Sequence, residues 1–314
     1  MNKAHALSKE NVFIRFYRLV VGKLPWYWWW ILPGLVLLVA VTVPPFIWII
    51  RMSLYKIFLS PTRPDVYVGG ANYLFYFSDP EVLAAWRRLG MYVISCMGLQ
   101  MGIGIGMAML MNKSKHENLL MAIYLVPLMF APVVTGYLFR VVMHSSYGIY
   151  HWFLQSLRII PVGSASLFGN PATTLWTVVM IDTWEWTPLV ILVVLAGLKV
   201  VPERVVEAAR IDGASKWRVF RDITIPFISP AILIALLLRF MDNIRFTDKI
   251  LSTTMGGPAD VTKTISIYTY YLSFRQFDLG YAATVGFLLL LVTIVAALVM
   301  TNVFRKFITP QMGR

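Results

Sequence analysis

Charged and aromatic side chains interrupt two of the most apolar stretches of this sequence. In the stretch 175–198, Asp182 and Glu185 are three residues apart and Trp186 follows Asp182 by four, a spacing that brings side chains to one helical face. Trp184 lies among them. A second set, spaced by three, four and seven residues, begins in the stretch 227–243 and comprises Arg239, Asp242, Asn243 and Phe246. Such groups can bond the hydroxyls of a polar solute, while an indole ring packs on a sugar or polyol.

The same residues also permit a purely structural interpretation. Ionisable groups in an apolar helix are costly, so they face a bundle interior or a water-filled cavity. In this interpretation Arg239 pairs with Asp182, Glu185 or Asp242 only to hold two helices together. The sequence leaves both interpretations open. Gln100, in an earlier apolar stretch, is a further candidate for contact with a solute.

The sequence lacks the residue sets that catalysis or metal binding requires. It contains no G-x-x-x-x-G-K-[ST] phosphate loop, and Gly22-Lys23 lies outside any such context. Cys96 is the single cysteine, which excludes an internal disulfide and a cysteine metal cluster. The four histidines fall in or beside connections between apolar stretches. We therefore expect no catalytic residue, no metal site and no cofactor on this chain.

Composition indicates a membrane protein. Hydrophobic residues make up 58% of the 314 residues, charged residues only 14%, and the mean hydropathy is +0.69, whereas soluble domains carry roughly 25% charged residues. A net charge of +13 could indicate nucleic-acid binding. However, the basic residues are distributed over the connections between apolar stretches, as membrane orientation requires. The predicted partner is a lipid bilayer and not nucleic acid.

Six apolar stretches are long enough to cross a membrane, whose core of about 30 Å needs about 20 helical residues. They are Trp28–Ile50, Leu89–Met111, Leu119–Met143, Leu175–Leu198, Phe227–Asn243 and Tyr281–Phe304. The predicted fold class is an all-α integral membrane protein with six transmembrane helices over 28–304. The segment 1–27 is expected to lie on the inner membrane surface, 305–314 to form a tail, and the long outer connections to be irregular.

Basic residues orient these spans. With the N-terminus inside, the inner connections hold 16 lysines and arginines in 72 positions, and the outer connections hold 10 in 106. The positive-inside rule therefore predicts that both termini are cytoplasmic. It also places the connection 199–226, between the fourth and fifth helices, in the cytoplasm.

That cytoplasmic connection has the pattern of two short helices joined by a glycine. The residues Glu203–Ile211 are strong helix formers, and Gly213 tolerates the left-handed conformation that ends a helix. Ser215 can cap a second helix through Trp217. The segment suits docking into a groove of another protein, although a solvated loop without a partner has the same composition.

The cytoplasmic connection resembles the EAA loop of binding-protein-dependent ABC importer permeases. The residues that carry this resemblance are Glu207, Ala208, Ala209, Asp212, Gly213, Ala214, Phe220, Ile223, Pro226 and Pro230. Two further segments resemble the carbohydrate branch of that family, of the maltose or glycerol-phosphate type. They are Asp182-x-Trp184-x-Trp186, and Phe246-Thr-Asp248 followed by Met255-Gly-Gly-Pro258.

The resemblance implies a permease subunit in a bacterial or archaeal cytoplasmic (inner) membrane. By alternating access it would carry a sugar, polyol or related hydroxylated solute into the cytoplasm. The implied partners are two ATP-binding subunits that hold ATP and Mg, a second permease and an extracytoplasmic solute-binding protein. The sequence names neither the solute nor the second permease. The alternative is a proton-coupled secondary carrier that uses Asp182 or Glu185 as a relay and needs no ATPase.

Overall fold

A computed structural model describes residues 28–60 and 62–312 and confirms the predicted all-α membrane fold. The predicted interfacial segment 1–27 lies outside the described residues. In the described part, the strands are the two-residue β1 (Tyr55–Lys56) and β2 (Val66–Tyr67), which pair antiparallel. All other regular structure in these ranges is helical.

The chain divides into two compact units, 1–52 and 53–314. The described part of the first unit is almost entirely α2 (Trp28–Ser53), whose composition is that of a membrane span. Its apolar side chains are largely exposed, as expected of a helix that faces lipid.

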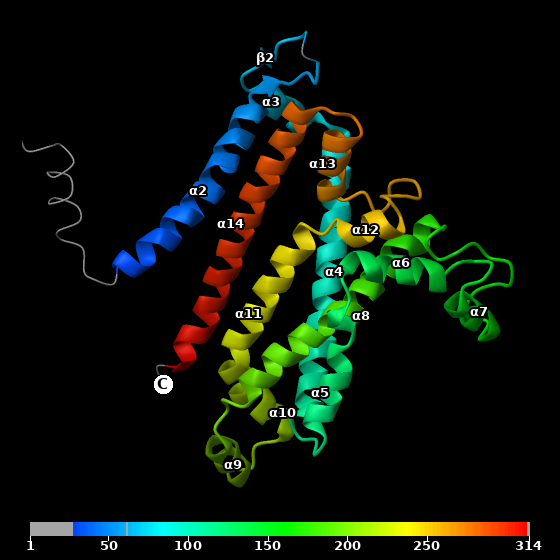
Figure 1. Ribbon diagram of the computed structural model, residues 1–314. Helices are drawn as coiled ribbons and strands as arrows, with labels where there is room; N and C mark the ends of the chain where they lie inside the picture. Colours follow the sequence, from blue (N-terminus) through cyan, green and yellow to red (C-terminus); the bar gives the residue numbers. More distant parts are fainter. Residues whose placement is uncertain (1–27, 61, 313–314) are drawn as a thin grey trace, which may run out of the picture. The chain divides into compact units, whose positions relative to one another are not determined.

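Four long helices form the frame of the second unit: α4 (Pro80–Met111), α8 (Pro171–Leu198), α11 (Ile225–Ile244) and α14 (Leu279–Met312). Helix α8 packs against both α4 and α11, and α11 also packs against α14 (Figure 1). All four include predicted spans. Helix α14 continues to Met312, through most of the segment 305–314 that was expected to be a tail.

The third predicted span is not one continuous helix. The stretch instead forms α5 (Glu117–Leu125), a 3-10 turn over Pro127–Met129, and α6 (Pro132–Val142). The segment Glu117–Met129 and helix α6 meet at an angle of 89°. Proline lacks a backbone donor and disfavours helical geometry in the preceding residue. Ala131, before Pro132, accordingly has an extended ψ of 140°. The described residues thus contain five helices able to span a membrane, or six if the bent pair crosses as one span.

The connections predicted to lie on the outer side contain short helices, whereas irregular loops were expected. They contain α3 (Ala71–Ser78), α7 (Ile149–Ser156), α12 (Asp248–Thr253) and α13 (Ile265–Phe274). Two-residue β pairing adds order to the first connection. Helix α13 packs on α4 and α14, α3 packs on α14, and α12 packs on α6. Such tertiary packing stabilises helices this short.

Asp79 joins three helices through its side chain. It is the N-cap of α4, where its carboxylate accepts a hydrogen bond from the Glu81 backbone N–H at 2.9 Å. The hydroxyls of Tyr268 on α13 and Tyr281 on α14 both donate to its other oxygen at 2.7 Å. One carboxylate therefore joins the start of α4 to α13 and α14.

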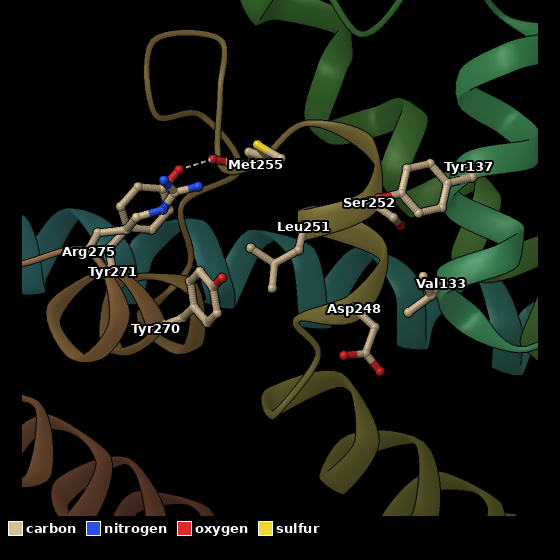
Figure 2. A pocket seen from close by; sticks show the side chains of 9 residues that line it. All are labelled: Val133, Tyr137, Asp248, Leu251, Ser252, Met255, Tyr270, Tyr271 and Arg275. Carbon is tan, nitrogen blue, oxygen red and sulfur yellow. Dashed lines mark hydrogen bonds between the residues drawn. The ribbon is translucent and has the colours of Figure 1, made fainter.

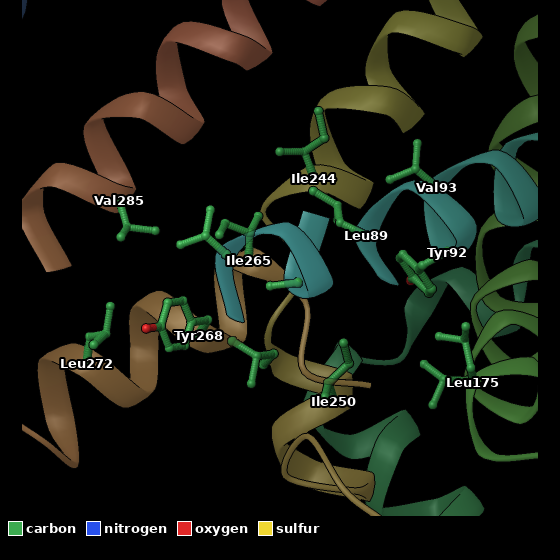
Figure 3. Close-up of a cluster of buried hydrophobic side chains, with 14 of the residues drawn as sticks. Leu89, Tyr92, Val93, Leu175, Ile244, Ile250, Ile265, Tyr268, Leu272 and Val285 are labelled. Atoms are coloured by element: carbon green, nitrogen blue, oxygen red, sulfur yellow. The ribbon is translucent and has the colours of Figure 1, made fainter. Parts of the chain in front are cut away.

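Two apolar clusters make up the core of the second unit. The first includes Leu89 and Tyr92 of α4, with residues of α8, α12, α13 and α14 (Figure 3). The second includes Ala108 of α4, Val190 of α8 and residues of α5 and α11. Between these clusters, the buried positions of α4 and α8 carry polar side chains, and the candidate site is built there.

The connection between α8 and α11 has the predicted form of two short helices. Helix α9 (Glu203–Ile211) has no buried residue, and Gly213 follows it with a φ of +77°. Ser215 caps α10 (Lys216–Val219) by accepting a hydrogen bond from the Arg218 backbone N–H at 3.3 Å. A π-helical turn over Phe220–Thr224 then continues directly into α11.

Candidate functional site

Asp182 of α8 is the centre of a buried polar network. Its carboxylate accepts hydrogen bonds from Arg239 of α11 at 2.9 Å, from Lys249 of α12 at 2.6 Å and from Gln100 of α4 at 2.8 Å. All four side chains are at most 1% exposed. One aspartate therefore links four helices, and each buried polar group that it contacts has a partner, as burial requires.

Lys249 joins a second carboxylate to this network. Its ammonium group pairs with Glu185 as well as Asp182, which lie on the same face of α8. Glu185 also accepts a hydrogen bond from the hydroxyl of Thr135 at 3.2 Å. Thr135 belongs to α6, so the bent pair is connected to the same cluster of charges.

The guanidinium of Arg239 is held on several sides. It donates to Gln100 Oε1 at 3.0 Å and to Asn243 Oδ1 at 2.8 Å, and it lies 3.5 Å from a carboxylate oxygen of Asp242. Its central carbon lies 4.4 Å from the centroid of the Trp186 ring, where the ring face attracts a cation. The position of this cation is therefore fixed by bonds in its plane and by a ring across its face.

Opposite charges are balanced within the network. Asp182 and Glu185 face the two buried cations, Arg239 and Lys249, while the half-buried Asp242 bonds the exposed Arg245 at 2.9 Å. Removing one partner of such a buried pair leaves an uncompensated charge and typically costs about 3–5 kcal/mol. The network therefore locks α8, α11 and α12 together.

An open pocket of about 360 Å³ lies against this network; we call it the main pocket. Its lining includes five of the eight residues proposed for the solute path: Trp186, Arg239, Asp242, Asn243 and Phe246. The Asn243 side chain is fully buried, and its oxygen is used by Arg239. Its Nδ2 has no hydrogen-bond partner among the described residues. Buried donors are seldom left unpaired, so this amide is an unsatisfied polar group in the wall of the main pocket.

The other three proposed path residues do not line the main pocket. Asp182 and Glu185 lie behind it, where their carboxylates form ion pairs with Arg239 and Lys249. Trp184 is 43% exposed and packs edge-on against Phe139, with the ring centroids 5.3 Å apart. The two interpretations of the charged residues thus apply to different groups: the carboxylates of α8 hold helices together, while the α11 residues and Trp186 face the pocket.

Sequence reasoning missed Lys249 and Thr135. Lys249 was assigned to an outer loop, yet it lies on α12 and is fully buried. Charge balance was the available signal, because Arg239 alone cannot neutralise three neighbouring carboxylates.

The proposed coupling residues form a separate group around α9 and α10. Glu207, Ala208 and Ala209 lie on α9, and the next three, Asp212, Gly213 and Ala214, form the turn. Phe220 starts the π-helical turn and Pro226 lies in the first turn of α11. Because α11 begins beside this group and ends at Arg239–Ile244, a single helix connects the coupling segment to the main pocket.

Two large apolar side chains of the coupling segment are exposed. Ile211 is 85% exposed and Trp217 is 66% exposed. The Trp217 and Phe220 rings lie 5.4 Å apart, centroid to centroid. Large exposed apolar residues on a charged frame indicate an interaction surface.

Known proteins are similar to this chain in sequence and in fold. Residues 100–309 match the family model described as the binding-protein-dependent transport system inner membrane component. The chain is 31% identical to the trehalose/maltose transport system permease protein MalF of Thermococcus litoralis over 278 residues, covering 88% of this chain and 91% of that one. It is 29% identical to the trehalose transport system permease protein SugA of Mycobacterium tuberculosis, over 87% of this chain and 86% of that one.

A solved structure has the same fold. The crystal structure of a bacterial alginate ABC transporter, in complex with an alginate pentasaccharide-bound periplasmic protein, contains a chain that superposes with a TM-score of 0.75. The likeness covers 95% of this chain and 99% of that chain at 18% identity. From the family match and the permease relatives, this chain belongs to the inner membrane components of binding-protein-dependent transport systems, and within them to the carbohydrate-uptake permeases of ABC importers.

Proposed function

We propose that this permease carries a hydroxylated, ring-containing solute through the main pocket. The observation that carries the proposal is the buried Asn243 amide, whose Nδ2 is unpaired at a pocket that also offers the Trp186 and Phe246 rings. Ligand sites combine apolar and aromatic walls with a few placed polar groups. A sugar ring meets this description because its hydroxyls bond amides and carboxylates while its C–H faces pack on aromatic rings.

The named relatives support this solute class. One is a trehalose/maltose permease and the other a trehalose permease. The charges at the main pocket also favour a neutral solute, because Arg239 and Arg245 are offset by Asp242 and Asp248. A sugar or polyol therefore fits better than a strongly ionic solute.

Conversion of Asn243 to Asp tests the pocket. The variant keeps an oxygen for Arg239 but replaces the free amide donor with an acceptor. We expect the KM for solute uptake to rise by up to about tenfold, the cost of one neutral hydrogen bond, with the amount of folded protein retained. Asn118→Asp, the same change at an exposed position on α5, is the control. An unchanged KM in Asn243→Asp would remove this pocket from the solute path.

We also propose that the α9–α10 segment docks on a separate ATP-binding subunit that supplies the ATP and Mg. The exposed Ile211 and Trp217 and the direct helical connection to the main pocket support this role. Alternating access follows if the docked segment takes different positions in the two nucleotide states, because a partner shifts only those equilibria for which its contacts differ.

The proposed assembly contains two ATP-binding subunits, a second permease and an extracytoplasmic solute-binding protein. Both termini are proposed to be cytoplasmic, on the side of the α9–α10 segment. The proton-coupled alternative requires Asp182 or Glu185 to release and bind protons during transport. Both carboxylates are paired with buried cations, an arrangement that favours a structural role.

A further inference from the structure

A second pocket, of about 210 Å³, lies beside the main pocket, where α6, α12 and α13 meet; we call it the side pocket. Figure 2 shows Tyr137 of α6 on one side and Leu251 of α12 in the middle. On the other side lie Tyr270 and Tyr271 of α13, with Arg275 directly after that helix. None of its lining residues belongs to the predicted solute path. The side pocket is therefore a separate site on the outer end of the second unit.

Part of the side pocket is fixed by internal bonds. The Tyr271 hydroxyl donates to the Met255 carbonyl at 2.7 Å, and the Ser252 hydroxyl donates to the Lys249 carbonyl at 3.1 Å. These bonds hold α13 and α12 at the walls of the pocket. The shape of the side pocket consequently depends on helix α12, which also carries Lys249 of the buried network.

Other polar groups of the side pocket are left free. Among the described residues, the hydroxyls of Tyr137 and Tyr270 and the guanidinium of Arg275 have no hydrogen-bond or ion-pair partner. The Asp248 carboxylate has only a long contact, 3.4 Å from the Thr247 hydroxyl. The pocket thus presents donors, an acceptor and tyrosine rings with no net charge, a combination suited to a neutral ring with hydroxyl groups.

Asp248 lines both pockets, and the adjacent residues Pro132 and Val133 of α6 line one pocket each. A solute that extends beyond the main pocket therefore reaches the side pocket across the Asp248 carboxylate. We propose that the side pocket binds the second or third ring of an oligosaccharide whose first ring occupies the main pocket. This inference rests on the proposed function and adds a length preference to it: chains of several neutral sugar rings over single rings.

Binding of glucose, maltose and maltotriose to the full-length permease in lipid nanodiscs tests the inference by calorimetry. We expect the wild type to bind maltotriose more tightly than glucose. Arg275→Ala and Tyr270→Ala should each weaken maltotriose binding about tenfold, equivalent to roughly 1.4 kcal/mol, and leave glucose binding unchanged. Both positions are at the surface or half-buried, so the variants should fold.

The controls make the same changes away from the side pocket: Arg87→Ala, exposed on α4, and Tyr150→Ala, exposed on α7. Neither should alter binding of any of the three sugars. Equal affinities for the three sugars in the wild type, or unchanged maltotriose binding in both side-pocket variants, would overturn the side-pocket inference while the main pocket stands. If the wild type binds none of them, the main-pocket proposal fails together with this one.

Discussion

At the scale of single residues, Lys249 is the group on which the buried network depends most. It neutralises Asp182 and Glu185 together, and all three side chains are essentially inaccessible to solvent. Gln100 and Arg239 complete the bonds of Asp182 but do not contact Glu185. Without the ammonium group, two carboxylates would lie side by side in an apolar interior, with Arg239 as their only nearby buried cation.

We predict that Lys249→Met lowers the stability of the folded permease by about 3–5 kcal/mol. Thermal unfolding in nanodiscs measures this. Lys263→Met is the matched control, since Lys263 is a more accessible lysine with carboxylate contacts of 3.5 and 3.7 Å, and such pairs contribute about 0–1 kcal/mol. Equal destabilisation by the two substitutions would show that the buried network contributes no more to stability than the contacts of Lys263.

Sequence spacing predicted which residues of α11 share a face, because a 3.6-residue period determines that face without tertiary information. Spacing could not predict that Trp186 faces the main pocket and Trp184 does not, because the position of Trp184 depends on its contact with Phe139 of α6. It also missed Lys249, because a six-residue helix in a long connection has too few residues to display a period. The carboxylates of α8 were found, but whether they bind solute or cations depends on which helices approach them.

At the scale of helices, the contact between α6 and α12 requires a glycine. A Cβ at Gly136 would lie within 1.8 Å of Ser252 Oγ and 2.9 Å of Ser252 Cβ. Helix α6 can therefore approach α12 closely only because Gly136 has no side chain. Both helices line the two pockets, so this contact sets the pocket walls.

Gly136→Ala should destabilise the permease by about 1–3 kcal/mol through overpacking and weaken solute binding. Ser252→Gly added to it should restore part of the loss, because it removes the clashing atoms. Gly102→Ala on α4, where a Cβ would meet no atom within 4 Å, is the control for thermal unfolding. A Gly136→Ala variant as stable as the wild type would contradict the close approach of α6 and α12.

The turn between α9 and α10 gives a second prediction at this scale. Gly213 has a φ of +77°, and proline is restricted to about −65°, so Gly213→Pro cannot form this turn. We expect it to abolish ATP-dependent uptake while membrane insertion and solute binding persist. Gly213→Ala should reduce uptake less, because alanine can enter this region at a cost of roughly 1 kcal/mol. Wild-type uptake by Gly213→Pro would contradict the coupling role.

The helix boundaries show where local sequence is sufficient. Glycine and serine at 213 and 215 predicted the α9–α10 turn, because the chemistry of a turn and a cap is local. The bend at Pro132 was missed although proline signalled it, because the stretch 119–143 is apolar apart from Arg140 and long enough for one span. Helices α3, α12 and α13 were missed because their stability comes from packing on other helices.

At the scale of the whole molecule, the second unit combines a buried charged network with two proposed functional regions, the coupling segment and the main pocket. The buried network links α4, α8, α11 and α12, and α11 runs from the coupling segment to the main pocket. Motion of the α9–α10 segment would therefore reach the pocket as movement of a whole helix. Composition and charge distribution predicted the membrane class and a cytoplasmic coupling segment, but no sequence pattern reveals which charges pair.

Reconstituted uptake tests the central claim most directly. The permease would be incorporated into proteoliposomes either with its ATP-binding, second-permease and solute-binding partners or alone, and labelled maltose uptake measured with and without ATP. We predict uptake only in the complete assembly, dependent on ATP hydrolysis and unaffected when the pH gradient is collapsed. Uptake by the chain alone, driven by a pH gradient without ATP, would contradict the account.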